Sequence, residues 1–214
     1  MPAPPEIARQ IGDICAVSRE TLGRLDHLVG AVGKWSRRIN LVADARPDAV
    51  WLRHVLDSAQ LFPLGRPAGR KWCDLGSGGG FPGLVIAILA RELTPGQRVV
   101  MVESDRRKAA FLTVMAQELD LNTAIAAVRA EDLAPQQAET VSARALAPLP
   151  ELLTLVARHL AEGGVALLPK GGGHAEEISH ARRRWAFTVE PIESILAPRS
   201  RILRVTELRR ADAA

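Results

Sequence analysis

The sequence predicts an α/β protein with a doubly wound, mostly parallel sheet of seven strands, an antiparallel hairpin at the carboxyl end and a helical extension at the amino end. Three observations predict this fold class. After residue 70, short apolar runs alternate with segments of helical periodicity. A glycine-rich turn follows the first run. The last two runs are joined by residues 191–199, a connection that suits an antiparallel pair better than a crossover.

The amino-terminal part is expected to be helical. Apolar residues recur mostly at helical spacing over residues 7–32. Ser18 or Thr21 can cap a second helix and so divide this segment. Pro47 suits the first position of a further helix, which we expect to reach about residue 62.

The remaining elements form the sheet and its covering helices. Strands are expected at 71–75, 98–103, 123–128, 140–144, 164–169, 186–190 and 201–208. Helices are expected between them at 82–93, 105–119, 148–161 and 174–184. Right-handed crossovers between successive strands give a parallel sheet. We therefore expect a helical extension at 1–65, packed on a Rossmann-like core at 66–214 as one compact unit.

Composition limits the class of protein. The chain has 214 residues, of which 47% are hydrophobic, so it can bury a sizeable core. No apolar run reaches the roughly 18 residues that a membrane span needs, and the first residues lack the pattern of a signal peptide. The chain has only two cysteines, Cys15 and Cys73, so a reduced cytoplasmic protein is expected. No feature of the sequence demands an oligomer, and a monomer is expected.

Positive charge is clustered. The formal net charge is only +4, but five groups of basic residues recur along the chain. They are Lys34/Arg37/Arg38, Arg66/Arg70/Lys71, Arg106/Arg107/Lys108, Arg182/Arg183/Arg184 and Arg199/Arg201/Arg204. A solvated helix face explains any single group well. All five together favour a basic surface, whose natural partner is a polyanion.

The glycine turn and the second strand predict a cofactor site. Residues 73–83 read Cys-Asp-Leu-Gly-Ser-Gly-Gly-Gly-Phe-Pro-Gly, and glycines allow a ligand to approach the backbone closely. About 20 residues further on, an apolar strand ends in Glu103, whose carboxylate can accept hydrogen bonds from both hydroxyls of a ribose. The sequence therefore predicts an adenosine-containing cofactor.

Two motifs overlap in this turn. Counted from Gly78, it fits the dinucleotide fingerprint G-x-G-x-x-G; counted from Asp74, it reads Asp-x-Gly-x-Gly-x-Gly and resembles the first motif of S-adenosylmethionine-dependent methyltransferases. The end of the strand makes Gly76 the first glycine, and Phe81 then stands where a dinucleotide site has its third. Asp74 can face the cationic end of the methionine moiety or orient the loop amides, whereas it would repel a pyrophosphate.

Four further segments carry a family resemblance. They are Lys-Trp-Ser-Arg-Arg-Ile-Asn-Leu at 34–41, Arg-His-Val-Leu-Asp-Ser at 53–58, Arg-Ala-Glu at 129–131 and Ser-Ala-Arg-Ala at 142–145. In this order around the glycine turn, they resemble the RsmG (GidB) family over about residues 31–208. Val42 departs from the threonine that the family often has.

The resemblance implies a class I methyltransferase fold, S-adenosylmethionine as cofactor, and methylation of N7 of a guanine in 16S ribosomal RNA, free or in the small subunit. The cofactor shell that it implies is Asp74, Gly76, Gly78, Phe81, Glu103, Ala130, Glu131 and Arg144. Arg144, at the end of the fourth strand, can pair with the cofactor carboxylate or with RNA. An ion pair with Asp74 or Glu103 is the alternative.

Catalytic and RNA-binding roles are also expected. Arg144 and Lys170 are the candidates for orientation and electrostatics. The residues expected to contact RNA are Lys34, Arg53, His54, Arg107 and Lys170. Lys170 precedes three glycines, from which we expect a mobile loop that reaches a phosphate; a plain connection is the alternative. His54 can equally be an internal brace. No metal site is predicted.

Guanine N7 carries a lone pair and no proton, so its methylation needs no general base. The lack of a Ser-His-Asp or nucleophilic cysteine arrangement therefore does not argue against catalysis. Two other functions stay open at this point. A nicotinamide-dependent dehydrogenase would need a catalytic proton donor, and a non-catalytic RNA-binding protein on a methyltransferase scaffold would keep the basic surface without binding cofactor.

Overall fold

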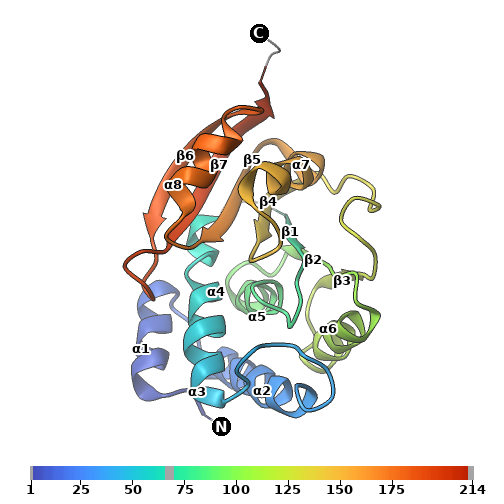
Figure 1. The fold of residues 1–214 in the computed structure, drawn as a ribbon. Coiled ribbons are helices and arrows are strands. Elements are labelled where there is room, and N and C mark those ends of the chain that lie inside the picture. The colour runs from blue at the N-terminus through green and yellow to red at the C-terminus, as the bar shows by residue number, and fades with distance from the viewer. Residues whose placement is uncertain (1, 66–69, 212–214) are drawn as a thin grey trace.

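One seven-stranded sheet organises the chain, whose computed structural model describes residues 2–65 and 70–211 (Figure 1). The strand order is β3-β2-β1-β4-β5-β7-β6. The strands are β1 (Lys71–Leu75), β2 (Arg98–Val102), β3 (Thr123–Ala126), β4 (Ala138–Ala143), β5 (Leu160–Lys170), β6 (Trp185–Glu193) and β7 (Arg201–Arg210). Strands β1 to β5 are parallel, and β7 lies antiparallel between β5 and β6. The predicted fold class is confirmed.

Helices cover the two faces of this sheet. They are α5 (Gly83–Leu93), α6 (Arg106–Glu118), α7 (Leu149–His159) and α8 (His174–Ala181). Alternate strand residues enter two different cores: Val99 and Met101 pack with α5 and α6, whereas Val100 and Val102 pack on the face that α7 covers. Both faces are buried, which explains why the strands read as continuous apolar runs. The order in which successive strands are added reverses between β1 and β4, and ligands of such folds bind at this point.

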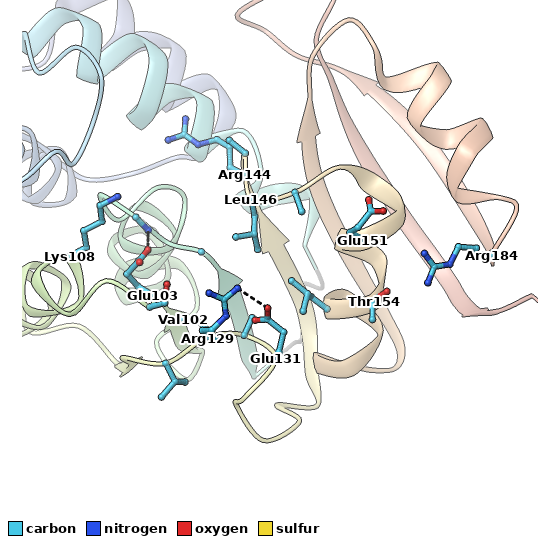
Figure 2. Close-up of a pocket in the computed structure, with 18 residues that line it drawn as sticks. Val102, Glu103, Lys108, Arg129, Glu131, Arg144, Leu146, Glu151, Thr154 and Arg184 are labelled. Carbon is cyan, nitrogen blue, oxygen red and sulfur yellow. Dashed lines mark hydrogen bonds and ion pairs between the residues drawn. The ribbon is translucent and has the colours of Figure 1, made fainter.

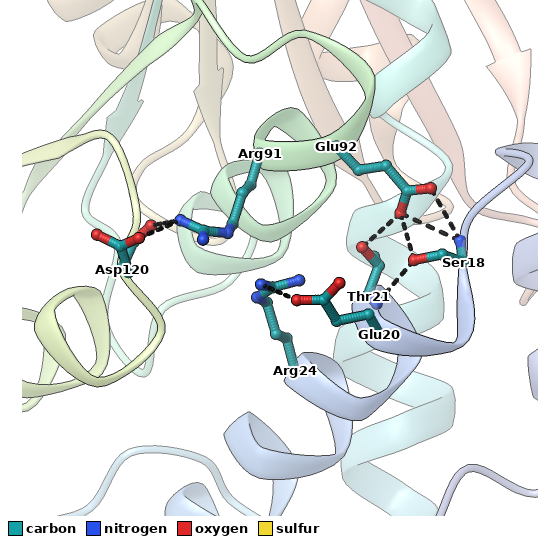
Figure 3. Close-up of polar contacts among 7 residues, drawn as sticks. All are labelled: Ser18, Glu20, Thr21, Arg24, Arg91, Glu92 and Asp120. Carbon is teal, nitrogen blue, oxygen red and sulfur yellow. Dashed lines mark hydrogen bonds and ion pairs between the residues drawn. The ribbon is translucent and has the colours of Figure 1, made fainter.

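The amino-terminal helices α1 (Pro5–Ile14) and α2 (Arg19–Trp35) share the first of these cores. Of the two expected caps, Ser18 is the one used, since its hydroxyl accepts the Thr21 amide. Glu92 of α5 accepts hydrogen bonds from the Ser18 amide and from the hydroxyls of Ser18 and Thr21 (Figure 3). The domain boundary at 65/66 stays a prediction, because residues 66–69, including Arg66 of a predicted basic cluster, lie outside the described part.

The helix expected from Pro47 to about residue 62 is not uniform. It consists of α3 (Pro47–Val50), the π-helical segment η1 (Trp51–Leu56), α4 (Asp57–Ala59) and the short 3₁₀ turn η2 (Phe62–Leu64). A π-helical turn is wider than an α-helical one and recurs at functional sites. Here it contains Arg53 and His54 of the family motif.

Two element ends differ from expectation. Helix α7 ends at His159 and β5 starts at once, because Leu160 already pairs with Ala138 of β4. Helix α8 ends at Ala181, before its three arginines. Within the described ranges, no helix is long and apolar enough to cross a membrane.

Candidate active site

The glycine turn after β1 is built from left-handed backbone. Gly76, Gly78 and Gly80 have φ values of +70°, +54° and +92°, which disfavour any residue with a Cβ. The amides of Gly76 and Ser77 donate to the carbonyl of Val102 at 2.9 and 3.0 Å, and so join the turn to β2. A Cβ added at Gly78 would meet nothing closer than 3.9 Å, so the space beside this residue is open.

Glu103 holds the turn from the end of β2. Its Oε2 accepts the Gly78 amide at 2.8 Å, and its Oε1 accepts the Asp105 amide at 2.7 Å. The residue is only 8% exposed. Its carboxylate therefore fixes the shape of the turn as well as facing the space beside it.

Asp74 lies behind the turn. It is fully buried, with Oδ2 accepting the Gly83 amide at 3.1 Å and Oδ1 accepting the Ser142 hydroxyl at 2.7 Å. Burial raises the pKa of this carboxyl to about 6, against the opposing effect of these hydrogen bonds. Of the two roles expected for Asp74, these contacts are those of a group that orients loop amides.

The larger cavity lies at the carboxyl edge of the strands and has a volume of about 580 Å³ (Figure 2). Six of the eight residues expected to bind cofactor line it: Gly76, Gly78, Glu103, Ala130, Glu131 and Arg144. The Ala130 carbonyl accepts a hydrogen bond from the buried His159, with 2.9 Å between O and Nε2, which positions the loop after β3. Asp74 and Phe81 are not in its lining.

A smaller cavity of about 360 Å³ adjoins the other side of the turn. Its lining is Leu41, Val42, Ala43, His54, Gly76, Ser77, Gly78, Gly79, Phe81, Arg144 and Ala145. Gly76, Gly78, Arg144 and Ala145 line both cavities. The two spaces therefore meet at the glycine turn and the end of β4.

Arg144 joins this meeting point to the π-helical segment. Its Nη1 donates to Asp57 Oδ2 at 3.2 Å and to the Arg53 carbonyl at 3.0 Å, and its Nη2 donates to His54 Nδ1 at 2.8 Å. The ion pair expected with Asp74 or Glu103 is thus made with Asp57 instead. The His54 ring stacks on Phe81, with 4.9 Å between ring centroids.

Burial shifts the pKa values of His54 and Asp57, the two titratable partners of Arg144. Burial and, after it, the charges of Arg144 and Arg53 lower the pKa of His54 to about 4, so the ring is neutral at physiological pH. A guanidinium only donates, so Nδ1 of His54 is an acceptor and the ring proton sits on Nε2. Burial raises the pKa of Asp57, and Arg144 opposes this rise.

Lys34, Arg107 and Lys170, which were also expected to bind RNA, do not line either of these two cavities. Lys34 lies in the last turn of α2, and Arg107 pairs with Asp105 at the start of α6, with 3.5 Å between Nη2 and Oδ2. Lys170 is the last residue of β5 rather than part of a loop. Its Nζ donates to Glu177 Oε2 at 2.8 Å and to the Ala147 carbonyl at 2.9 Å, so the expected phosphate ligand is an internal brace here.

Comparison with known proteins identifies the family. The family model described as "GidB: rRNA small subunit methyltransferase G" matches residues 22–201. The chain belongs to this family. "Ribosomal RNA small subunit methyltransferase G" of Cereibacter sphaeroides (strain ATCC 17029 / ATH 2.4.9) is 49% identical over 192 residues, 90% of this chain and 93% of that protein. Its counterpart in Rhodospirillum centenum is 46% identical over 208 residues, 97% and 94% of the two chains.

Solved structures agree with the fold of this GidB family member. A methyltransferase from Geobacter sulfurreducens gives a TM-score of 0.54 at 16% identity, over 89% of this chain and 96% of that one. The T. thermophilus 16S rRNA N2 G1207 methyltransferase RsmC, in complex with AdoMet and guanosine, gives 0.52 at 19%, over 73% and 40%. The predictions of the family and of an rRNA methyltransferase enzyme are confirmed.

Sequence reasoning missed part of this GidB site. The far end of the larger cavity includes Leu146, Glu151, Thr154 and Arg184, which face it from the segment after β4, from α7 and from the turn before β6 (Figure 2). Only Arg184 had a signal, as a member of a basic cluster. In residues 2–65 and 70–211, no group of three or more His, Cys, Asp or Glu is arranged to hold a metal ion.

Proposed function

We propose that this chain transfers a methyl group from S-adenosylmethionine to N7 of one guanine in 16S ribosomal RNA. The observation that carries the proposal is the meeting of two cavities at Gly76, Gly78 and Arg144. The larger cavity takes the methyl donor and the smaller one takes the guanine. Family membership supports the class of reaction.

The larger cavity fits the cofactor. Its volume lies within the roughly 300–1,000 Å³ of ligand sites. The backbone at Gly78 is open to it, and the Glu103 carboxylate stands beside this backbone. In the bound state, Gly76 and Gly78 would lie along the methionine part, Glu103 would accept from the ribose hydroxyls, and the loop at Ala130 and Glu131 would meet the adenine edge.

Methylation of guanine N7 requires no proton transfer to or from the protein. Bound S-adenosylmethionine supplies a methyl group that is already activated by its sulfonium. Guanine N7 has an in-plane lone pair and no proton, so the residues of this chain need to orient the base and exclude water. Neutral His54 and the Arg144–Asp57 pair add little net charge beside a base that becomes positive on methylation.

Arg144 and Lys170 have different roles in this proposal. Arg144 is the catalytic candidate, because it alone among the expected catalytic residues lines both cavities. Lys170 is a positioning residue, because its bond to the Ala147 carbonyl braces the segment that carries Arg144. We place the enzyme in the cytoplasm, as a monomer that acts on 16S rRNA or the small subunit.

The test is to incubate the protein with methyl-labelled S-adenosylmethionine and small ribosomal subunits from cells that lack the corresponding gene, and to map the label. Label at one guanine N7 is expected, and label at another atom would refute the assignment. Absence of label together with absence of cofactor binding would favour the non-catalytic RNA-binding function. Arg144→Lys should lower kcat about tenfold or more while Arg98→Lys, at the opposite edge of the sheet, should not.

A further inference from the structure

A third hollow adjoins the smaller cavity at Ala43. It has a volume of about 530 Å³ and lies between the end of α2 and the segment that leads into α3. Its lining is Val29, Gly30, Gly33, Lys34, Arg37, Ala43, Asp44, Ala45, Arg46 and Pro47. We call it the α2 groove. Ala43 lines both the α2 groove and the smaller cavity, so the two hollows adjoin at this residue, and the smaller cavity also contains His54 and Arg144.

The charge of the α2 groove is positive at its rim. Arg46 is tied to Asp44, with 2.6 Å between Nη2 and Oδ2, and so adds little net charge. Lys34 and Arg37 are exposed, and no acidic side chain in the described part of the chain pairs with either. Both cations are therefore available to an anion. The small residues Gly30, Gly33 and Ala45 let an extended strand lie close to the backbone.

The arginines of the β6–β7 hairpin and of the turn before it are less available to an anion. Arg182 lies over the ring of Phe187, and Arg210 over that of Trp185, at 5.3 and 4.1 Å from the ring centroids. Arg201 and Arg204 of β7 pair with acids of β6. Much of this positive charge is engaged within the hairpin.

We infer that the α2 groove holds the single-stranded RNA that flanks the target base, with phosphates at Lys34 and Arg37 while the base passes Ala43 into the smaller cavity. This inference rests on the proposed function, since it takes the smaller cavity as the guanine site. The partner is an RNA single strand because the groove combines free cations with a base-sized space that adjoins it at Ala43. A base that is read or modified must leave its stack.

The experiment compares charge reversals at two places. Lys34→Glu with Arg37→Glu reverses two charges at the groove. Arg19→Glu with Arg98→Glu makes the same change of charge at exposed sites, one at the other end of α2, about 22 Å along the helix, and one at the amino end of β2. The probe is the small ribosomal subunit that lacks the modification, with binding measured without S-adenosylmethionine from about 50 to 200 mM salt.

The groove variant should bind at least tenfold more weakly than wild type, and the slope of log affinity against log salt should fall by about 2, because two phosphate contacts are lost. The matched control should lose less than threefold. Lys34→Gln with Arg37→Gln, which removes the charges without reversing them, should show the same change of slope with a smaller loss.

Equal losses in the groove variant and the control would overturn the inference, as would a wild-type protein that does not bind the subunit. So would a loss confined to Arg182→Glu with Arg183→Glu, which would place the RNA on the hairpin. Because binding is measured without methyl transfer, a wild-type protein that binds the subunit through the groove but does not methylate it would refute the proposed reaction alone.

Discussion

Asp74→Asn separates two roles for the acid of the glycine motif. In the structure, the carboxylate accepts from the Gly83 amide and from the Ser142 hydroxyl. An asparagine oxygen can keep the first bond, and its amide can donate to the Ser142 oxygen, which also accepts from Trp72 Nε1 at 2.8 Å. The substitution therefore removes a buried charge and keeps the bond to the Gly83 amide, while the Ser142 hydroxyl changes from donor to acceptor.

The pKa of Asp74 gives the size of the expected change in the free energy of unfolding. Its rise from 3.8 to about 6 means that about 3 kcal/mol opposes ionisation in the folded chain, at roughly 1.4 kcal/mol for each pH unit. Because the folded pKa is raised, this penalty is absent below about pH 4, grows as the pH rises, and is complete above about pH 6. We expect Asp74→Asn to raise the free energy of unfolding at pH 8 by about 1–3 kcal/mol and to leave it unchanged at pH 4.

The assay is urea unfolding at both pH values, with calorimetry of S-adenosylhomocysteine binding at pH 8. Cofactor affinity should change less than threefold, because Asp74 is not in the cavity lining. Asp74→Ala is the control: it leaves the Gly83 amide and the Ser142 hydroxyl unpaired and should cost about 1–3 kcal/mol for each group. A destabilised Asp74→Asn at pH 8, or a tenfold loss of cofactor affinity, would refute the reasoning.

Three further predictions concern the same site. Glu103→Ala should weaken S-adenosylhomocysteine binding at least tenfold, because the ribose hydroxyls lose their acceptor and the Gly78 amide of the turn and the Asp105 amide lose a charged one. Unchanged affinity in calorimetry, equal to that of exposed Glu162→Ala, would contradict this. Gly83→Ala should lower the free energy of unfolding by about 1–3 kcal/mol, since its Cβ would lie 2.6 Å from Met101 Cγ, and wild-type stability in urea would exclude this overpacking. Because the pKa of His54 is lowered in the folded chain, the unfolded chain binds the proton first, and the free energy of unfolding falls as the pH falls from 6.5 towards 4. Urea unfolding of His54→Asn should show a smaller loss of stability over this range than wild type, and equal losses would contradict the buried, neutral state of His54.

Local patterns determined the fold and the family. Apolar periodicity located all seven strands, because a buried parallel sheet needs continuous apolar runs and its helices need an apolar face. The glycine turn could be recognised in the sequence because left-handed backbone favours glycine whatever surrounds it. Glu103 followed from its place at the end of the neighbouring strand. These signals act over a few residues or through the regular spacing of βαβ units.

The tertiary structure alone decided which side chains work together. Arg144 and Asp57 are 87 residues apart, and their pairing depends on how the π-helical segment lies against the end of β4. The change from α- to π-helical hydrogen bonding leaves no periodic trace in six residues. Asp74 and Lys170 were expected at a ligand because their positions along the chain are right, but one points into the core and the other into an ion pair. The sequence located each strand to within a few residues, and packing determined where the side chains at its end point.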